Sequence, residues 1–145
     1  YAPVSDEYFE ADKSHGAYCN KRRLIISGTS ANIRTIIDNY PQAKGVTLEL
    51  LNDLNIPGYI ESGSIALKIC RIADGTADLF FKAMEPKDWD LAAPKLIIEE
   101  AGGVLRDAYG NEIKLGKSSR HHHGLIAAKN LAMLERVSGW YRSRK

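Results

Sequence analysis

The sequence predicts an α/β layered domain in which helices pack on a mixed sheet. Two observations support this prediction. Short runs of β-branched and aromatic residues alternate with amphipathic segments of helical spacing, and no repeat or low-complexity tract interrupts the alternation. The 145 residues, of which 44% are hydrophobic, suit one compact core. We therefore expect a single domain over residues 1–145.

The first part of the chain predicts a small antiparallel sheet. Residues 7–11 alternate polar and apolar side chains, residues 15–20 supply a turn, and residues 24–27 form a short β-branched run. Residues 33–38 fit either a helical face or a strand, and their density of isoleucine and threonine favours a strand. The segment Asn-Tyr-Pro at 39–41 ends it.

The rest of the chain alternates between helices and strands. Some segments carry apolar residues at helical spacing, and others are short apolar runs bounded by turn residues. Residues 64–73 are mostly apolar, so we expect that helix to be deeply buried. The expected helices are 46–54, 64–73, 91–101 and 131–142, and the expected strands are 59–61, 77–83, 104–108 and 124–128.

Composition and charge argue against several classes of partner. The net charge of +2 is too small to indicate a nucleic-acid polymer or an acidic membrane surface. No apolar run reaches the roughly 20 residues that cross a bilayer, so we expect no membrane insertion. Cys19 and Cys70 lie far apart and lack metal-ligand spacing, which indicates reduced thiols in a cytoplasmic protein.

The strongest local signal runs from Asp88 to Gly103, a segment that opens with acids and closes with paired glycines. Pro94 has no N–H and belongs in the first turn of a helix, so the spacing predicts a helix that begins near Asp90. Asp90 is then either a cap for free N–H groups, or a carboxylate held rigidly beside Trp89 that binds a hard cation. The spacing alone favours the cap.

Four motifs in the chain resemble those of one enzyme family. Trp-Asp-Leu-Ala-Ala at 89–93, followed by an apolar stretch and Glu-Ala-Gly-Gly at 100–103, resembles the C-terminal signature of the inositol monophosphatase family. Three other segments occur in the order of that family's motifs: Gly-Ala-Tyr-Cys-Asn at 16–20, Ser-Gly-Ser-Ile-Ala-Leu at 62–67 and Ala-Asp-Leu-Phe at 77–80. The resemblance covers nearly the whole chain.

This resemblance implies a fold, an activity and site residues. Members of the family are α+β sandwiches of the sugar-phosphatase type that bind Mg²⁺ through clustered carboxylates and hydrolyse small phosphorylated substrates, commonly as homodimers. By resemblance, Asp90 is a catalytic residue and a metal ligand. Gly63, Ser64 and Ile65 line the substrate site in the same comparison. Taken without it, Gly63 and Ser64 are interpreted as a turn glycine and a helix cap.

Lys82 departs from the family pattern. Many relatives carry at this position an acidic residue that contacts substrate hydroxyls, whereas here Glu85 lies in a connection one residue longer. Two interpretations stay open: Lys82 binds a second phosphate of the substrate, or it is a solvated lysine at a strand end. His121, His122 and His123 are expected on a loop surface, because three adjacent side chains do not converge on one metal.

Two other family motifs, Glu-Glu and Asp-Pro-x-Asp-Gly-Thr, do not occur here in matching context. Asp74-Gly75-Thr76 lacks the preceding Asp-Pro and is expected to be a turn. Because Mg²⁺ sites need several oxygen ligands, we expect this chain alone to be a weak or inactive phosphatase. We interpret residues 1–145 as the C-terminal, substrate-side domain, with Tyr1 as a cut edge and the N-terminal metal-binding domain absent from this chain.

The leading functional hypothesis is a Mg²⁺-dependent phosphomonoesterase. Its candidate substrates are an inositol monophosphate, fructose 1,6-bisphosphate or a 3′(2′),5′-bisphosphate nucleotide. The missing ligands belong either to a longer chain or to a second chain. The alternative from another class is a non-catalytic binding or dimerisation module that keeps the fold. A nucleotide-binding regulator is disfavoured, because the sequence has no glycine-rich phosphate loop.

Overall fold

The computed structural model describes residues 1–116 and 123–145. The elements are, in chain order, β1 (Phe9–Asp12), β2 (Gly16–Cys19), β3 (Arg22–Leu24), β4 (Thr35–Asp38), α1 (Gly45–Asp53), β5 (Gly58–Glu61), α2 (Ile65–Ala73), β6 (Leu79–Lys82), α3 (Asp88–Glu100), β7 (Val104–Arg106), β8 (Leu125–Ala128) and α4 (Leu131–Ser143). The segment that allowed either a helix or a strand contains β4, so the expectation of a strand there is confirmed.

Within these described ranges the strands form two sheets. The larger sheet has the order β5-β4-β6-β8-β7, in which β4, β5 and β6 are parallel and β8 runs antiparallel to its two neighbours. The smaller sheet is antiparallel, with the order β1-β2-β3. The larger sheet is therefore mixed and carries helices, which confirms the predicted fold class.

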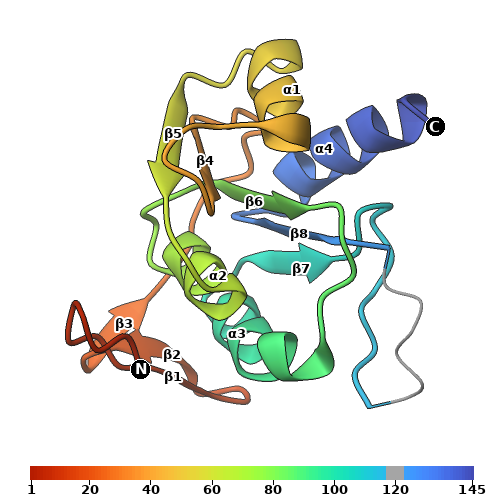
Figure 1. Ribbon diagram of the computed structural model, residues 1–145. Coiled ribbons are helices and arrows are strands. Elements are labelled where there is room, and N and C mark those ends of the chain that lie inside the picture. Colours follow the sequence, from red (N-terminus) through yellow and green to blue (C-terminus); the bar gives the residue numbers. More distant parts are fainter. Residues whose placement is uncertain (117–122) are drawn as a thin grey trace.

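Helices cover both faces of the larger sheet (Figure 1). On one face lie α1 and α4, where Leu50 and Val137 share a buried cluster with Phe81 of β6. On the other face lie α2 and α3, and this cluster includes Ile98 and Phe80. The smaller sheet packs against α3, so that helices, sheet, helices and sheet follow one another as layers. This arrangement is the predicted α+β sandwich.

The central strands are apolar on both sides because both of their faces are covered. In β8 all four residues are buried. Leu125 and Ala127 belong to the cluster under α2 and α3, whereas Ile126 and Ala128 belong to the cluster under α1 and α4. The alternation of side chains along a strand thus supplies both cores from one short segment.

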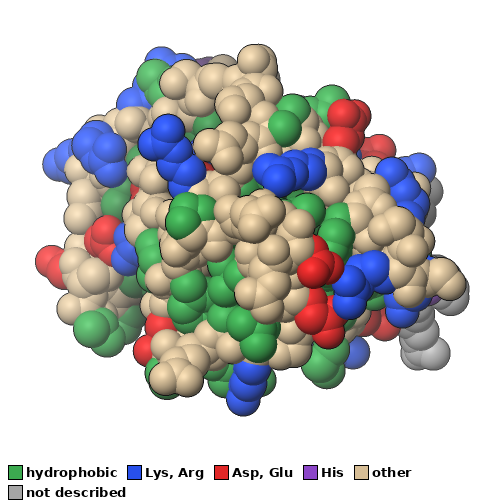
Figure 2. Space-filling view, turned by 90° about the horizontal axis from the view of Figure 1, so that it is seen from above, with side chains coloured by type: hydrophobic (Ala, Val, Ile, Leu, Met, Phe, Trp, Pro, Cys, Tyr) green, Lys and Arg blue, Asp and Glu red, His purple; other side chains and the backbone are tan. Residues whose placement is uncertain are grey.

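The outer face of α1 and α4 is mixed in charge and also exposes apolar side chains. Figure 2 shows Lys and Arg side chains interspersed with Asp and Glu on this face. At the end of α4, Arg144 forms ion pairs with Glu49 at 2.5 Å and Asp53 at 2.7 Å. These pairs link α4 to α1 across the surface.

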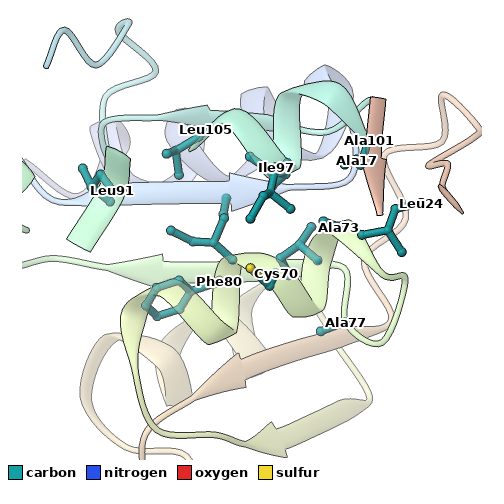
Figure 3. Packing of buried hydrophobic residues seen from close by; sticks show 14 of the residues in the cluster. Ala17, Leu24, Cys70, Ala73, Ala77, Phe80, Leu91, Ile97, Ala101 and Leu105 are labelled. Atoms are coloured by element: carbon teal, nitrogen blue, oxygen red, sulfur yellow. The ribbon is translucent and has the colours of Figure 1, made fainter. Parts of the chain in front are cut away.

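Buried side chains of α2 and α3 pack against one another (Figure 3). Cys70 and Ala73 of α2 lie in one buried cluster with Ile97 and Ala101 of α3. The helix at 65–73 has five buried residues, which confirms the expectation that it is deeply buried. Small residues in both helices let the two backbones approach each other.

Gly103, just after α3, lies close to Ile98 of that helix, to Ile26 and to the end of β8. A Cβ at this position would lie 2.7 Å from Ile98 Cγ1, 2.9 Å from Ile26 Cδ1 and 3.1 Å from the Ala128 carbonyl oxygen. Real Cβ contacts are not that short, so a larger residue would push β7 away from α3. Gly103, the second of the paired glycines, therefore follows the end of the helix and also allows close packing of the surrounding residues.

The expected turn at residues 15–20 is wrong, because Gly16–Cys19 is the central strand of the small sheet. Glu100 at the end of α3 accepts hydrogen bonds from the N–H groups of Ser14 at 2.9 Å and Gly16 at 3.0 Å. These bonds lower the pKa of Glu100 and hold the preceding turn against α3. A tertiary contact thus moves the turn to residues 13–15 and frees the next residues for the strand.

The expected strand at 24–27 is also displaced. The strand β3 covers Arg22–Leu24, and residues 25–27 leave the sheet. Here Ile26 N–H donates to the Ala101 carbonyl oxygen at 2.7 Å. Because this oxygen lies at the end of α3, the apolar run joins the small sheet to that helix and does not extend the strand.

Two expectations about the chain as a whole can be compared with the structure. Cys19 and Cys70 are both free and buried, as predicted for reduced thiols. Over residues 1–116 and 123–145, no helix has the length and the apolar character that a membrane span requires.

An ion-pair cluster ties the N-terminal segment to α2. Arg71 donates to both carboxylate oxygens of Glu7 and, at 2.8 Å, to Asp74. The side chains of Arg71 and Glu7 are 19% and 23% exposed, so water screens the pair only partly. The Arg71 hydrogen bonds lower the pKa of Glu7 to about 2.

We expect Glu7→Gln to destabilise the protein by about 1–2 kcal/mol at neutral pH, because the bond to Arg71 loses its charge. Glu7 has a lowered pKa in the folded state, so its contribution is complete above the ordinary value of 4.5 and fades as the pH falls towards about 2. Urea unfolding of both proteins between pH 7 and pH 2.5 measures this difference.

The matched control is Glu10→Gln, because Glu10 is exposed in β1 and its carboxylate makes no hydrogen bond or ion pair with a described residue. It should leave the free energy of unfolding unchanged. A difference between wild type and Glu7→Gln that stays constant over this pH range would contradict the assigned ion pair.

Candidate functional site

The parallel strands place three helix starts at one edge of the larger sheet. The strands β4, β5 and β6 end at Asp38, Glu61 and Lys82, and the helices α1, α2 and α3 follow them in turn. Because these strands are parallel, their carboxyl ends share one edge, and each helix begins there. Helix N-termini present free N–H groups and a positive dipole end, so this edge suits a polar or anionic ligand.

The connections leave this edge in opposite directions. From β4 the chain passes through α1 to β5, whereas from β6 it passes through α3 on the other face to β7. The adjacent carboxyl ends of β4 and β6 are therefore a topological switch point. In open α/β sheets such a point forms a crevice, and ligands bind there.

The start of α2 holds the predicted substrate-side residues. Ser64 is the N-cap of α2, and its Oγ accepts a hydrogen bond from the Leu67 N–H at 3.3 Å. Its φ of 55° lies in the left-handed region, which costs about 1 kcal/mol or more for a residue with a side chain. Gly63 precedes Ser64 and borders open space, since a Cβ there would meet nothing within 4 Å. Ile65 is the first residue of α2, and its side chain is half-buried.

The helix α3 begins at Asp88, two residues before the position expected from Pro94. Lys87 is the N-cap, and Asp90 is the third helical residue, whose Oδ2 accepts from the Lys87 N–H at a long 3.4 Å. Pro94 then lies in the second turn, where its missing N–H leaves the Asp90 carbonyl without the usual helical donor. Acidic side chains in the first turn explain why the helix can begin two residues earlier.

The aromatic neighbour does not enclose the Asp90 carboxylate. Trp89 is 78% exposed, so the expected rigid support from this ring is wrong. The second oxygen of Asp90 makes no hydrogen bond to a described residue, and the side chain is half-buried. Asp90 thus helps to cap the helix through one oxygen and leaves the other available.

A second carboxylate in the same turn is more enclosed. Asp88 Oδ2 accepts from the Gly116 N–H at 3.0 Å, and its Oδ1 is buried without a hydrogen-bond partner. Across the described residues, no three His, Cys, Asp or Glu side chains are grouped so that they could hold a metal ion. Asp90 can therefore supply one oxygen ligand, and the described part of the chain does not complete a site around it.

Lys82 ends β6 half-buried, and its ammonium group makes no hydrogen bond or ion pair with a described residue. It shares a strand face with Phe80, on the side that α2 and α3 cover. Gly124 packs directly on it, because a Cβ there would lie 2.3 Å from the Lys82 carbonyl oxygen. The β8 strand therefore fixes the backbone from which this lysine projects.

The other residues that the sequence analysis named are Glu85 and the three histidines. Glu85 is exposed in the connection from β6 to α3. His123 is exposed, as expected of a loop, and its ring makes an edge contact with Tyr109 at 5.6 Å between centroids. His121 and His122 lie outside the described residues.

Asp74-Gly75-Thr76 forms the expected turn. Asp74 caps the end of α2 and accepts a hydrogen bond from the Thr76 N–H at 2.9 Å, and Gly75 has a positive φ of 84°. The Asp74 carboxylate also pairs with Arg71. These contacts account for the motif as a local structure.

Two hollows border these residues. One, of about 280 Å³, lies between α2 and α3 beside residues 1–3 and is mostly apolar, with Ser64 and Pro94 in its wall. The other, of about 220 Å³, lies at the carboxyl ends of β4 and β6, and its wall includes Lys82. The sequence-predicted residues at 64 and 82 therefore line different hollows at the same sheet edge.

Sequence reasoning missed two residues at this edge, Lys68 and Asn39. Lys68 is completely buried in α2, and its ammonium group donates to Asn39 Oδ1. A signal was available in the pattern, because Lys68 lies three residues after Ile65 and four before Ile72 on an apolar helical face. A charge at such a position must find a buried partner.

The fold and this edge define a layered α/β protein with a hollow at a topological switch point. The profile of the inositol monophosphatase family matches residues 1–138, and the chain belongs to that family. It is 31% identical over 147 aligned residues to inositol monophosphatase 1 of Rattus norvegicus, which covers 95% of this chain and 51% of the relative.

Similar proteins also occur in microorganisms. A fructose-1,6-bisphosphatase/inositol-1-monophosphatase of Methanocaldococcus jannaschii is 29% identical, with 93% of this chain and 53% of the relative covered. The structure of inositol monophosphatase from Anabaena aligns with a TM-score of 0.80 at 23% identity, over 99% of this chain and 57% of that one. That likeness shows the fold. The chain spans about half the length of the curated relatives it matches.

Two substitutions at Ser64 separate its cap from its backbone strain. Ser64→Ala removes the cap and keeps a side chain at positive φ, so we expect it to destabilise the protein by about 0.5–2 kcal/mol. Ser64→Gly also removes the cap but relieves the left-handed strain, so it should cost less, by about 1 kcal/mol. Urea unfolding of the two variants beside wild type measures both values. Equal costs for alanine and glycine would contradict the strained conformation.

Proposed function

We propose that this chain is the substrate-side part of a Mg²⁺-dependent phosphomonoesterase that acts on a small phosphorylated polyol, sugar or nucleotide. One observation carries the proposal most directly: the Asp90 carboxylate lies in the first turn of α3, at the sheet edge where α2 also begins and where Lys82 ends β6. Membership of the inositol monophosphatase family supports the same reaction class.

Asp90 is the proposed metal ligand and catalytic residue. Its half-buried carboxylate keeps one oxygen free of hydrogen bonds to described residues, and Mg²⁺ prefers hard oxygen ligands. When bound, Mg²⁺ would lower the pKa of a bound water and neutralise charge on a phosphoryl group. We propose that the remaining ligands come from outside residues 1–145, in a separate metal-binding domain.

The N-terminus of α2 is the proposed substrate-side wall. Gly63, Ser64 and Ile65 place the first N–H groups of the helix at the sheet edge, where a phosphate oxygen or a hydroxyl can accept from them. The open space beside Gly63 leaves room for a ligand to reach this backbone. Lys82 would add a positive charge on the same side of the sheet.

Relatives supply the range of candidate substrates. One matched structure is described as inositol monophosphate bound, another as 2′AMP bound, and the Methanocaldococcus relative is named for fructose 1,6-bisphosphate as well. Inositol monophosphate and fructose 1,6-bisphosphate are each named among these relatives, whereas 2′AMP is a nucleotide with a single phosphate. The 3′(2′),5′-bisphosphate nucleotide stays in the proposal as an expectation from the sequence alone. A homodimer and a cytoplasmic location also remain predictions, to be tested by sedimentation and by fractionation of the source cells.

The experiment is an assay for phosphate release with and without Mg²⁺, on this chain alone and joined to the coding sequence immediately upstream of Tyr1. Even outer-shell partners of a metal typically contribute about 10–100-fold to activity or affinity, so loss of a direct ligand in Asp90→Asn should lower kcat at least about 100-fold. The Mg²⁺ concentration required for half-maximal activity should rise as well.

The matched control is Asp53→Asn, because Asp53 ends α1 at the opposite edge of the sheet, where it bonds Trp140 and Arg144. It should keep wild-type activity. Mg²⁺-dependent release that is indifferent to Asp90→Asn would remove Asp90 from the metal site. No release from either form would favour the alternative, a binding or dimerisation module with the phosphatase fold.

A further inference from the structure

A third hollow lies at the opposite edge of the larger sheet from the candidate functional site. It holds about 260 Å³ and borders the loop between β3 and β4 and the start of α4. Three charged residues stand at this edge: Arg34 directly precedes β4, Asp78 directly precedes β6, and Lys129 directly follows β8. Because β4, β6 and β8 are neighbours and β8 runs antiparallel to β6, the topology brings all three into the wall of the hollow.

Among the described residues that line this hollow, Asp78 is the one acid, and its carboxylate is already fully bonded. The side chain is 10% exposed, and Oδ1 pairs with Lys129 Nζ at 2.5 Å. Oδ2 accepts from the backbone N–H groups of Arg34 at 2.7 Å and Thr35 at 3.1 Å. The carboxylate therefore fastens the start of β6 to the start of β4 and to the end of β8, and it has no oxygen left to bind a cation.

Positive charge in this wall exceeds the negative charge. Arg34 and Lys129 line it beside the single carboxylate. Arg34 is exposed, and its guanidinium makes no hydrogen bond or ion pair with a described residue. A lysine ammonium has three donors, and the pair with Asp78 uses one of those of Lys129. The wall thus keeps a net positive charge and free N–H donors, which favour an anion.

Hydroxyl groups on the loop before β4 add neutral donors. Ser27 lines the hollow, and its hydroxyl makes no hydrogen bond with a described residue. Ser30 Oγ accepts from the Asn32 N–H at 3.1 Å, which leaves its own O–H free to donate. Asn130 holds this loop, because its NH₂ group donates to the carbonyl oxygens of Gly28 at 3.3 Å and Ser30 at 3.0 Å. A wall that is fixed before binding loses less conformational entropy when a ligand arrives.

The helix α4 begins at the same wall. Its cap is already present, since Asn130 Oδ1 accepts from the Met133 N–H at 2.9 Å. The first turn contains no acidic residue that would repel an anion. The helix end therefore adds a favourable dipole, whereas the contacts themselves come from the side-chain cations and hydroxyls.

We propose that this hollow binds a phosphate group, at a site separate from the candidate functional site. Its volume is several times the roughly 30 Å³ that one water occupies in the liquid, which is room for a tetrahedral oxyanion. Arg34 is the contacting charge, because a planar guanidinium can donate two parallel hydrogen bonds to two phosphate oxygens. Lys129 and the Ser27 hydroxyl supply further donors. The ligand is inorganic phosphate or the phosphate group of a small metabolite, and its binding does not depend on the proposed hydrolysis.

The test is a two-dimensional ¹⁵N–¹H NMR titration of the 145-residue chain with inorganic phosphate at constant ionic strength. The backbone signals of residues 27–34 and 129–133 should shift together and saturate. Chloride over the same concentration range should not produce these shifts. A parallel titration with glycerol 3-phosphate separates the two sources: tighter binding than that of inorganic phosphate indicates a metabolite, and weaker binding indicates the free ion.

Substitutions at Arg34 assign the binding to this hollow. Arg34→Gln should weaken phosphate binding about tenfold or more, because it removes a charge-assisted hydrogen bond. Arg34→Lys keeps the charge without the planar fork and should retain part of the affinity. Both variants should fold like wild type, since the backbone bond from residue 34 to Asp78 stays. The matched control, Lys13→Gln, removes a charge from the exposed β1–β2 turn and should leave the phosphate affinity unchanged.

The outcomes separate this inference from the proposed function. Absence of a saturable shift at residues 27–34 and 129–133, equal shifts with chloride, or an affinity that survives Arg34→Gln would each overturn the phosphate site. Shifts confined to the signals around Ser64 and Lys82 would place the anion in the candidate functional site and would also reject this one. Saturable binding that Arg34→Gln weakens would support it, even if phosphate release proves independent of Asp90.

Discussion

The packing of α2 and α3 between two sheets is the constraint on which the rest of the structure depends. Both helices contribute to the cluster that reaches from Phe80 in the larger sheet to Ala17 in the smaller one. A helix covered on two sides must carry small or branched residues around most of its surface. Gly103 shows how little freedom remains, since even one methyl group there would overlap Ile98.

This layered packing also decides where chemistry can occur. With both faces of the larger sheet covered by helices, a ligand can reach the core strands only at their ends. The parallel crossovers bring three helix starts to one of those ends, together with Asp38 and Lys82. Backbone N–H groups and polar side chains thus lie together along this edge, where Ser64 and Lys82 line two different hollows.

Sequence patterns predicted the layers well because apolar periodicity records which face of an element is buried. They placed β6, α2 and α4 within a residue or two. They failed where a tertiary contact overrides local preference. The turn before β2 was misplaced because the N–H groups of Ser14 and Gly16 donate hydrogen bonds to Glu100. They also missed Lys68, since a linear sequence does not show that a lysine in an apolar helix meets Asn39 from a loop 29 residues away.

The two native cysteines are expected to be unreactive towards alkylating reagents, which allows a label to be attached at an introduced cysteine. Burial raises the pKa of Cys70 to about 12 and also raises the pKa of Cys19, so neither thiol is appreciably ionised at neutral pH. The thiolate is the reactive form, and both side chains are enclosed. A cysteine introduced at an exposed position such as Met84 would therefore be the single site for alkylation, and a fluorophore attached there would report on the sheet edge without background from the native thiols.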